Sequence, residues 1–419
     1  MVLEIKLSNF FSVDEEVTLD MRAANINTQK TRDLSHLCFD FNDDQILKSA
    51  VIYGANASGK SNIIKAIRFC HAMVYESHKH NEDTNFNFMP FKFSKKKAAP
   101  SHYFIRFVAE GIEYAYSFSL TNTEIVKESL YYYPQGKKAK VFVRDESIKG
   151  DKRDKYSFAK SVIKRPFDVV ENTSRKTLYI SRASQMDREI PKILFNFFHN
   201  DFILRHSYFA ASNIESLQKT HKTQLLKALQ LADSDIVDFK VKVIQQPGKK
   251  VRVSLDTEEL HIEDGFMEQL EIKTYHKFNR EVPFDFFTEE SLGTQKLFFM
   301  MMSIIDVLSN NKVLLIDEIE DSLHPKIIEY IIELFHRSER AQLIFTTHNT
   351  HILDLKRFRK DQIWFVNKKE NGSSDLYSLY DYSDFRDTMD VEKAYLQGRF
   401  DSVPIVDYSS ESLKHLMDE

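Results

Sequence analysis

The sequence predicts an α/β fold whose mixed sheet is assembled from two distant parts of the chain. Short apolar runs followed by helical patterns occur near residue 50 and again between residues 313 and 345. Buried strands that alternate with helices in this way form parallel sheets. The stretch between these parts has alternating patterns typical of antiparallel strands instead. We therefore predict two halves of one head, residues 1–80 and 286–419, and an inserted α+β arm or lid at residues 81–285.

The first half opens with a small β layer. Residues 2–7 alternate apolar with charged side chains, and residues 17–19 could return antiparallel to them. Residues 22–44 are polar and predict a surface loop. The apolar run 50–53 then predicts a buried strand, and residues 62–73 place isoleucines on one face of a helix.

Between this strand and helix lies the pattern G-x-x-x-x-G-K-[ST], at residues 54–61. Its glycines let successive amide N–H groups point at one anion beside a helix N-terminus, which favours negative charge. Lys60 would reach the β and γ phosphates of ATP, and the Ser61 hydroxyl would hold Mg²⁺. The predicted nucleotide-binding residues here are Gly54, Asn56, Ala57, Ser58, Gly59, Lys60, Ser61 and Asn62.

The inserted region begins with an antiparallel sheet. Residues 103–108 and 114–120 are strand-like, and Pro134-Gln135-Gly136 joins a further hairpin. Residues 177–180 predict a strand and residues 189–204 a helix.

The second part of the inserted region begins with a capping-box pattern at Ser212, which predicts the start of a helix. Residues 237–243 alternate strictly and predict a hairpin that turns at Pro247-Gly248 and returns through Val253. Residues 269–275 predict another strand.

The second half of the head carries a strong helix at 294–309, buried strands at 313–316 and 342–345, and a helix at 325–335. Asp317 and Glu318 follow the first of these strands, at the edge where open α/β sheets place their ligands. Asp317 would bind Mg²⁺, and Glu318 would accept a proton from the attacking water. His348 follows the next strand and would lie close to the γ-phosphate. Taken alone, each of these features is also compatible with a structural role.

Ser291 and Gly293 stand at the start of the helix at 294–309. A serine there can offer its hydroxyl and nearby N–H groups to phosphate, although it also serves as an ordinary helix cap.

Together these motifs resemble a known family. Residues 54–61, 291–295, 313–318, 322–325 and His348 are similar to cassette-type ATPases related to SMC and DNA-repair proteins. More narrowly, the chain resembles the RloA and AbiL group of bacterial anti-phage, abortive-infection ATPases, which are related to OLD-type nucleases. That narrower likeness rests on four segments: residues 290–296, 320–325, 361–366 and 395–400.

The resemblance implies a head-to-tail homodimer or higher oligomer in which Ser291 and Gly293 of one subunit close over ATP held by residues 54–61 of the other. Residues 322–324 would lie at the seam between the subunits. It also implies a defence switch that controls an effector or nuclease encoded nearby. The alternative is an SMC-like repair or chromosome-associated ATPase that acts directly on nucleic acid.

Composition limits which partners and which cellular compartment we expect for this protein. The formal net charge is −4, so only local patches could bind nucleic acid. Each short basic cluster is more typical of a solvated surface than of a nucleic-acid site, and if one of them binds a phosphate backbone, residues 356–360 are the best candidate. Two cysteines argue against a disulfide framework, and no apolar run predicts a membrane span, so we expect a cytoplasmic protein. After His348 the acidic residues are scattered with no apolar sheet pattern to collect them, so the sequence predicts no nuclease centre.

Overall fold

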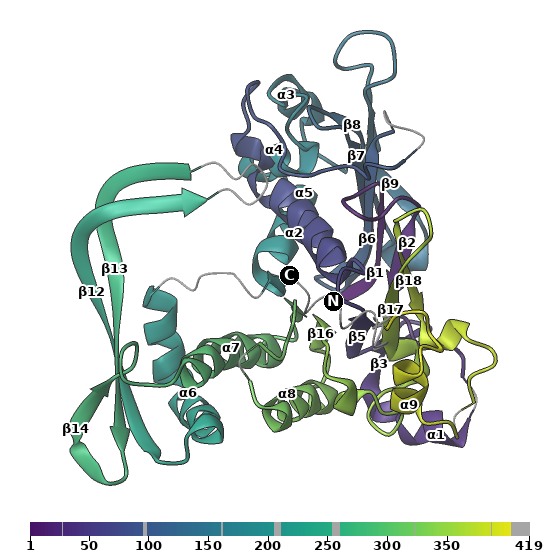
Figure 1. The fold of residues 1–419 in the computed structure, drawn as a ribbon. Coiled ribbons are helices and arrows are strands. Elements are labelled where there is room, and N and C mark those ends of the chain that lie inside the picture. Colours follow the sequence, from purple (N-terminus) through teal and green to yellow (C-terminus); the bar gives the residue numbers. More distant parts are fainter. Residues whose placement is uncertain are drawn as a thin grey trace, which may run out of the picture.

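The computed structural model describes residues 1–26, 28–94, 99–160, 162–204, 211–253, 260–321, 323–386 and 388–403. Two large sheets organise this part of the chain, and a long three-stranded sheet extends to one side (Figure 1).

The first sheet has six strands in the order β11-β15-β16-β5-β17-β18. The first five are parallel, and β18 is antiparallel to β17. Their bounds are β11 Phe202–Leu204, β15 Val313–Ile316, β16 Gln342–Thr346, β5 Ser49–Gly54, β17 Ile363–Lys368 and β18 Ser374–Ser378. Because β16 pairs directly with β5, the predicted sheet built from two distant parts of the sequence is confirmed. The prediction that no sheet pattern follows His348 is wrong, since β17 and β18 extend this sheet.

The second sheet is antiparallel, with the order β10-β9-β8-β7-β6-β1-β2. Its strands are β1 Val2–Ser8, β2 Val17–Asp20, β6 Ser101–Ala109, β7 Ile112–Leu120, β8 Ile125–Tyr132, β9 Ala139–Asp145 and β10 Tyr156–Phe158. The predicted pairing of β1 with β2 and the hairpin of β8 with β9 are both present. Since β1 also pairs with β6, this one sheet contains strands from both sides of the predicted boundary at residue 80.

The third sheet is the arm, β12 Ile236–Val253, β13 Leu260–His276 and β14 Asn279–Asp285, which Figure 1 shows reaching away from the body. The predicted turn at Pro247-Gly248 is wrong. β12 runs straight through it and pairs Pro247 with Phe266 of β13. A continuous ladder to a separate strand therefore overrides the local turn preference.

Helices fill both faces of the parallel sheet. α2 Lys60–Glu76 lies on one face, and α7 Leu292–Ser309 and α8 Pro325–Arg337 lie on the other. α6 Ala211–Ala232 packs against α7 and against β12 of the arm. β5 is buried on both sides: Ala50 and Ile52 belong to a core that includes α2 and the antiparallel sheet. Val51 and Tyr53 join α7 and α8 in a second core.

Three local predictions are corrected. Residues 177–180 are not a strand, because the helix α4 Tyr179–Gln185 begins there. The predicted helix at 189–204 is divided into α5 Glu189–Asn196, one π-helical turn and β11. The predicted loop at 22–44 contains the helix α1 Gln29–Asp33 and the strand β3 Cys38–Phe41. β3 forms a hairpin with β4 Asp44–Leu47. The remaining helices are α3 Pro166–Glu171 and α9 Val391–Leu396.

One helix of the described segments, α7, is long and apolar enough to span a membrane by length and composition alone, which the sequence analysis did not anticipate. Of its residues, 56% are buried inside the protein, as is usual for a core helix.

Candidate functional site

The loop between β5 and α2 has the shape that a phosphate requires. β5 ends at Gly54 and α2 begins at Lys60, with Gly59 as its N-cap at a φ of 112°. A Cβ on Gly59 would overlap the Ser374 hydroxyl, and one on Gly54 would lie 2.5 Å from the Val366 carbonyl oxygen. Neither position has room for a Cβ atom, so glycine is required at both. Gly59 in addition has the left-handed backbone conformation that other residues disfavour.

Residues that sequence reasoning missed brace this loop. Ser374 of β18 donates its hydroxyl to the Ser58 carbonyl oxygen at 2.6 Å and lies 2.7 Å from the Ser12 hydroxyl. Asn62 donates to the same Ser12 oxygen at 3.0 Å. Ser12 and Ser374 come from opposite ends of the sequence, so no local pattern could have linked them to residues 54–61.

Lys60 is held inside the loop. Its ammonium donates to the carbonyl oxygens of Gly54 at 2.6 Å and Ala55 at 3.2 Å, and the residue is 5% exposed. Burial lowers the pKa of Lys60, and the nearby carboxylates of Asp317 and Glu318 partly oppose that shift. The lysine and the two carboxylates therefore share one electrostatic environment.

Asp317 and Glu318 are fixed by a single buried threonine. Thr346 donates its hydroxyl to Asp317 Oδ1 at 2.6 Å and accepts the backbone N–H of Glu318 at 2.7 Å. Glu318 has a φ of 52°, which turns the chain away from β15 and leaves its side chain exposed. A left-handed non-glycine residue costs about 1–3 kcal/mol and is common at functional sites. Thr346 was part of the predicted strand end, but no role was predicted for it.

His348 follows β16 at the same edge of the sheet, and its side chain is exposed. Its backbone N–H donates to Glu320 Oε1 at 2.5 Å. Glu320 also contributes to the field at Lys60, although the sequence analysis gave it no catalytic role.

The structure brings together most of the predicted site. Residues 54–62, Asp317, Glu318 and His348 lie at the carboxyl ends of three neighbouring parallel strands, β5, β15 and β16. Ser58 Oγ is buried without a hydrogen-bond partner among the described residues, so it is a donor able to meet a phosphate oxygen. Ser61 and Asp317 supply the oxygen ligands that Mg²⁺ prefers. These hydrogen-bond donors and metal ligands therefore fit a nucleoside triphosphate with its bound Mg²⁺.

Ser291 and Gly293 are placed elsewhere. Ser291 is the N-cap of α7 and accepts the Thr294 N–H at 3.1 Å, and Leu292 beside it is 70% exposed. Within the described chain, its side-chain hydrogen bonds stay inside its own helix. Lys296 of the same helix pairs with Asp321 at 2.9 Å, so the start of α7 is tied to the loop after β15. Ser322, predicted to lie at a subunit seam, is outside the described residues.

The basic run at 356–360, which was the candidate if any basic cluster binds a phosphate backbone, is not an open cationic patch. Arg359 is 4% exposed and ion-paired with Asp361 at 2.7 Å, and Arg357 pairs with Glu329 at 2.9 Å. Lys360 donates to the Phe385 carbonyl oxygen, which leaves Lys356 as the exposed member. This run therefore offers little to a phosphate backbone.

A parallel sheet with a glycine-lined phosphate loop, a buried lysine and two carboxylates at its carboxyl edge defines a P-loop ATPase. Residues 49–354, more than half of the chain, match the family described as "AAA domain, putative AbiEii toxin, Type IV TA system". The chain belongs to that family and is an AAA-type ATP-binding protein. No curated protein matches the chain.

Solved SMC head domains are similar over most of the chain. The SMC head domain from Thermotoga maritima is 15% identical, covering 90% of this chain and 98% of that one, at a TM-score of 0.39. An SMC head bound to the C-winged helix domain of ScpA is 15% identical, covering 90% and 97%, at 0.41. A Pyrococcus furiosus Smc head with an extended coiled coil, bound to the C-terminal domain of ScpA, is 16% identical, covering 96% and 99%, at 0.39. TM-scores this low add nothing to the family assignment.

Proposed function

We propose that this chain is a Mg²⁺-dependent ATPase that dimerises head to tail on ATP and acts as the switch of a cytoplasmic anti-phage, abortive-infection system. The proposed ATPase activity rests mainly on Thr346. Its hydroxyl hydrogen-bonds both the Asp317 carboxylate and the Glu318 backbone N–H and so holds these residues together near Lys60. An Asp317 carboxylate oriented in this way needs no rearrangement when charge develops in the transition state.

Each residue has one role in this proposal. Lys60 and the N–H groups of the loop bind the phosphates, and Ser61 and Asp317 hold Mg²⁺, which would neutralise charge on the phosphate oxygens. Glu318 accepts the proton of the attacking water, and His348 contacts the γ-phosphate side of the site. Ser291, which is exposed at the N-cap of α7, and Gly293 complete the site of a second subunit.

The defence role is supported by the family description, which names an AbiEii toxin and a toxin-antitoxin system. It is also supported by the likeness of residues 290–296 and 320–325 to the RloA and AbiL group. In this proposal the ATP-driven dimer controls a partner effector or nuclease.

Phosphate release from ATP tests the enzymatic part, with and without Mg²⁺. For the defence part, the chain is expressed with its native neighbouring genes in a phage-sensitive host, and plaque formation is compared between wild type and Glu318→Gln. We expect protection only with the wild type. Equal plaque numbers with the wild type, the variant and an empty vector would contradict the defence role and favour the alternative of an ATPase acting directly on nucleic acid, tested by DNA-stimulated turnover.

A further inference from the structure

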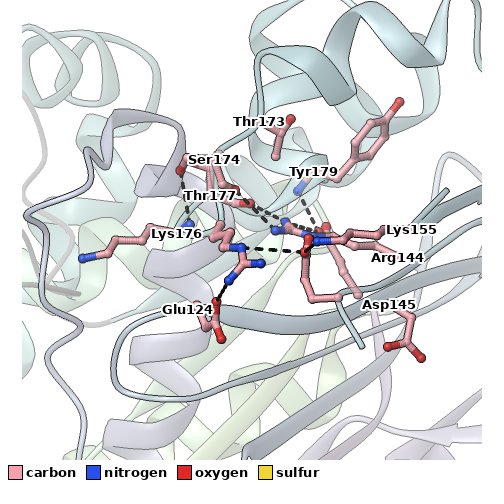
Figure 2. A network of polar contacts seen from close by, with 12 residues as sticks. Glu124, Arg144, Asp145, Lys155, Thr173, Ser174, Lys176, Thr177 and Tyr179 are labelled. Carbon is pink, nitrogen blue, oxygen red and sulfur yellow. Dashed lines mark hydrogen bonds and ion pairs between the residues drawn. The ribbon is translucent and has the colours of Figure 1, made fainter. Parts of the chain in front are cut away.

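A charged cavity of about 510 Å³ lies in the antiparallel half of the protein and shares no lining residue with the site above. Its walls come from the turn after β7, from β9 and the loop that follows it, from the segment after α3, and from Glu82 in the loop that follows α2. Figure 2 shows the polar contacts around Arg144, with Lys155, Ser174 and Thr177 nearby. The volume is within the range of small-molecule sites, which run from about 300 to 1,000 Å³.

The lining is positively charged overall, with five cationic side chains against three carboxylates. Glu146 lies 2.8 Å from Arg144 and 2.9 Å from Lys155, and Glu124 pairs with Arg175 at 3.0 Å. These carboxylates are therefore already shared among three cations.

Lys152 and Lys176 are bonded differently. Their ammonium groups donate to backbone carbonyl oxygens, of Glu171 at 2.8 Å and of Thr84 at 2.5 Å. A carbonyl oxygen satisfies a donor but carries no full charge, so these two hydrogen bonds do not neutralise the ammonium groups, although Glu171 and Glu146 contribute to the field at Lys152. An anionic ligand would gain most from contact with them.

Arg144 makes the floor of the cavity rigid. It is 1% exposed, and its guanidinium donates to the carbonyl oxygens of Thr177 at 2.8 Å and Ser174 at 3.3 Å, as well as to Glu146. The segment that carries Ser174 and the neighbouring lining residues is thereby fixed before any ligand arrives, which reduces the entropy lost on binding.

The chemistry of the lining selects a class of ligand. Clustered arginine and lysine groups beside hydroxyls are the usual recognition set for phosphate. Glu82 and Glu124 would repel a long polyanion such as a nucleic-acid backbone, but they can accept hydrogen bonds from the hydroxyl or amino groups of a small ligand. A phosphorylated molecule of about nucleotide size meets both conditions.

The cavity wall is hydrogen-bonded to the far end of the phosphate-loop helix. α2 begins at Lys60 and runs 17 residues to Glu76, a length of about 25 Å at 1.5 Å per residue. Directly after it, Ser77 accepts hydrogen bonds from the Thr177 hydroxyl at 3.0 Å and from the Leu178 N–H at 3.1 Å. One rigid element therefore joins the catalytic loop to the segment that lines the cavity.

We propose that this cavity binds a small phosphorylated molecule of about nucleotide size and that its occupation alters ATP turnover through α2. The regulatory part rests on the proposed ATPase function, whereas the binding part does not. The coupling element is a named helix with hydrogen bonds at one end to the cavity wall and the phosphate loop at the other.

Calorimetric titration with AMP and with inorganic pyrophosphate tests binding. It is done on Lys60→Ala protein, so that the phosphate loop does not contribute. We expect one site for at least one of the two probes, and a loss of at least about tenfold in affinity when Lys152→Met and Lys176→Met are added, because two charged hydrogen-bond donors are removed. The matched control carries Lys127→Met and Lys140→Met, which are lysines of β8 and β9 outside the cavity lining. No binding, or equal binding in the cavity and control variants, would overturn the site.

The regulatory part is tested by kcat at saturating ATP, with the phosphate loop intact. We expect the probe that binds to change kcat at least about twofold in the wild type and in the Lys127→Met, Lys140→Met control, with no change in the Lys152→Met, Lys176→Met protein. An equal response in all three proteins would show that the probe acts at the phosphate loop and would overturn the regulation. Absence of ATPase activity in the wild type would contradict the proposed function and the regulation with it, while the calorimetric result alone decides the site.

Discussion

The phosphate loop and the start of α7 differ in how far each is completed by its own chain. The loop is enclosed: Lys60 is 5% exposed, and Ser12 and Ser374 brace the backbone from two other segments. The start of α7 faces outward, with Ser291 exposed and Leu292 70% exposed. The loop is thus completed within its own chain, whereas the start of α7 is exposed, as the proposed contact with a second subunit requires.

Because of this difference, we expect mutations in the phosphate loop and mutations at the start of α7 to impair the protein in different ways. A defect in the enclosed half should abolish binding or chemistry within one chain. A defect in the outward half should leave the single chain intact and impair only its assembly with another. The following four variants test the enclosed half, from the largest expected effect to the smallest, and the mixing experiment after them tests the outward half.

Lys60→Ala should reduce ATP turnover to background, because it removes the ammonium that the loop holds at Gly54 and Ala55 for the phosphates. Phosphate release and nucleotide titration measure this effect. Lys65→Ala, an exposed lysine of the same helix, is the control and should behave as wild type. Wild-type turnover by Lys60→Ala protein would rule out residues 54–61 as the site.

Glu318→Gln should lower kcat by about 100-fold or more while ATP still binds, since the amide keeps the volume but cannot accept the proton. ATP-bound dimers should accumulate, as measured by light scattering. Glu339→Gln, at an exposed turn after α8, serves as the control. Unchanged turnover in the Glu318 variant would assign the proton acceptor to another group.

Thr346→Val should lower kcat by about tenfold. It removes the hydroxyl that orients Asp317 and accepts the Glu318 N–H. About 1.4 kcal/mol of lost transition-state stabilisation corresponds to tenfold in rate. Thr346→Ser restores the hydroxyl and should recover most of the activity. If serine and valine variants are equally slow, the effect is one of packing and not of positioning.

Ser374→Ala should have the smallest effect, a rise of about two- to tenfold in the KM for ATP with little change in kcat. It removes the hydrogen bond to the Ser58 carbonyl oxygen, which is worth about 0.5–1.5 kcal/mol. Steady-state kinetics separate the two parameters. A fall in kcat at constant KM would show that Ser374 does more than brace the loop.

The enclosed half was also the more predictable one, because its signal is contiguous. Residues 54–61 and the strand before Asp317 can be read in single windows of sequence. Ser12, Ser374 and Thr346 could not be assigned roles, since their function arises from hydrogen bonds between separate segments.

The errors elsewhere have the same origin. Residues 177–180 are apolar enough for a strand, yet the buried Glu128 carboxylate of β8 accepts the N–H groups of Tyr179 and Ile180 and so caps a helix there. Pro247-Gly248 is a strong local turn signal, but the long pairing of β12 with β13 decides its conformation. Contacts distant in sequence outweigh local preference in both cases.

The central claim, that one site is shared between two chains, is tested most directly by mixing two inactive proteins. In Ser291→Arg protein the phosphate loop is intact, and in Lys60→Ala protein the start of α7 is intact. A head-to-tail dimer of the two therefore contains one whole site and one doubly damaged site, so we predict that ATPase activity returns on mixing. No activity in the mixture, together with wild-type ATP-driven association by Ser291→Arg protein in light scattering, would contradict the shared site.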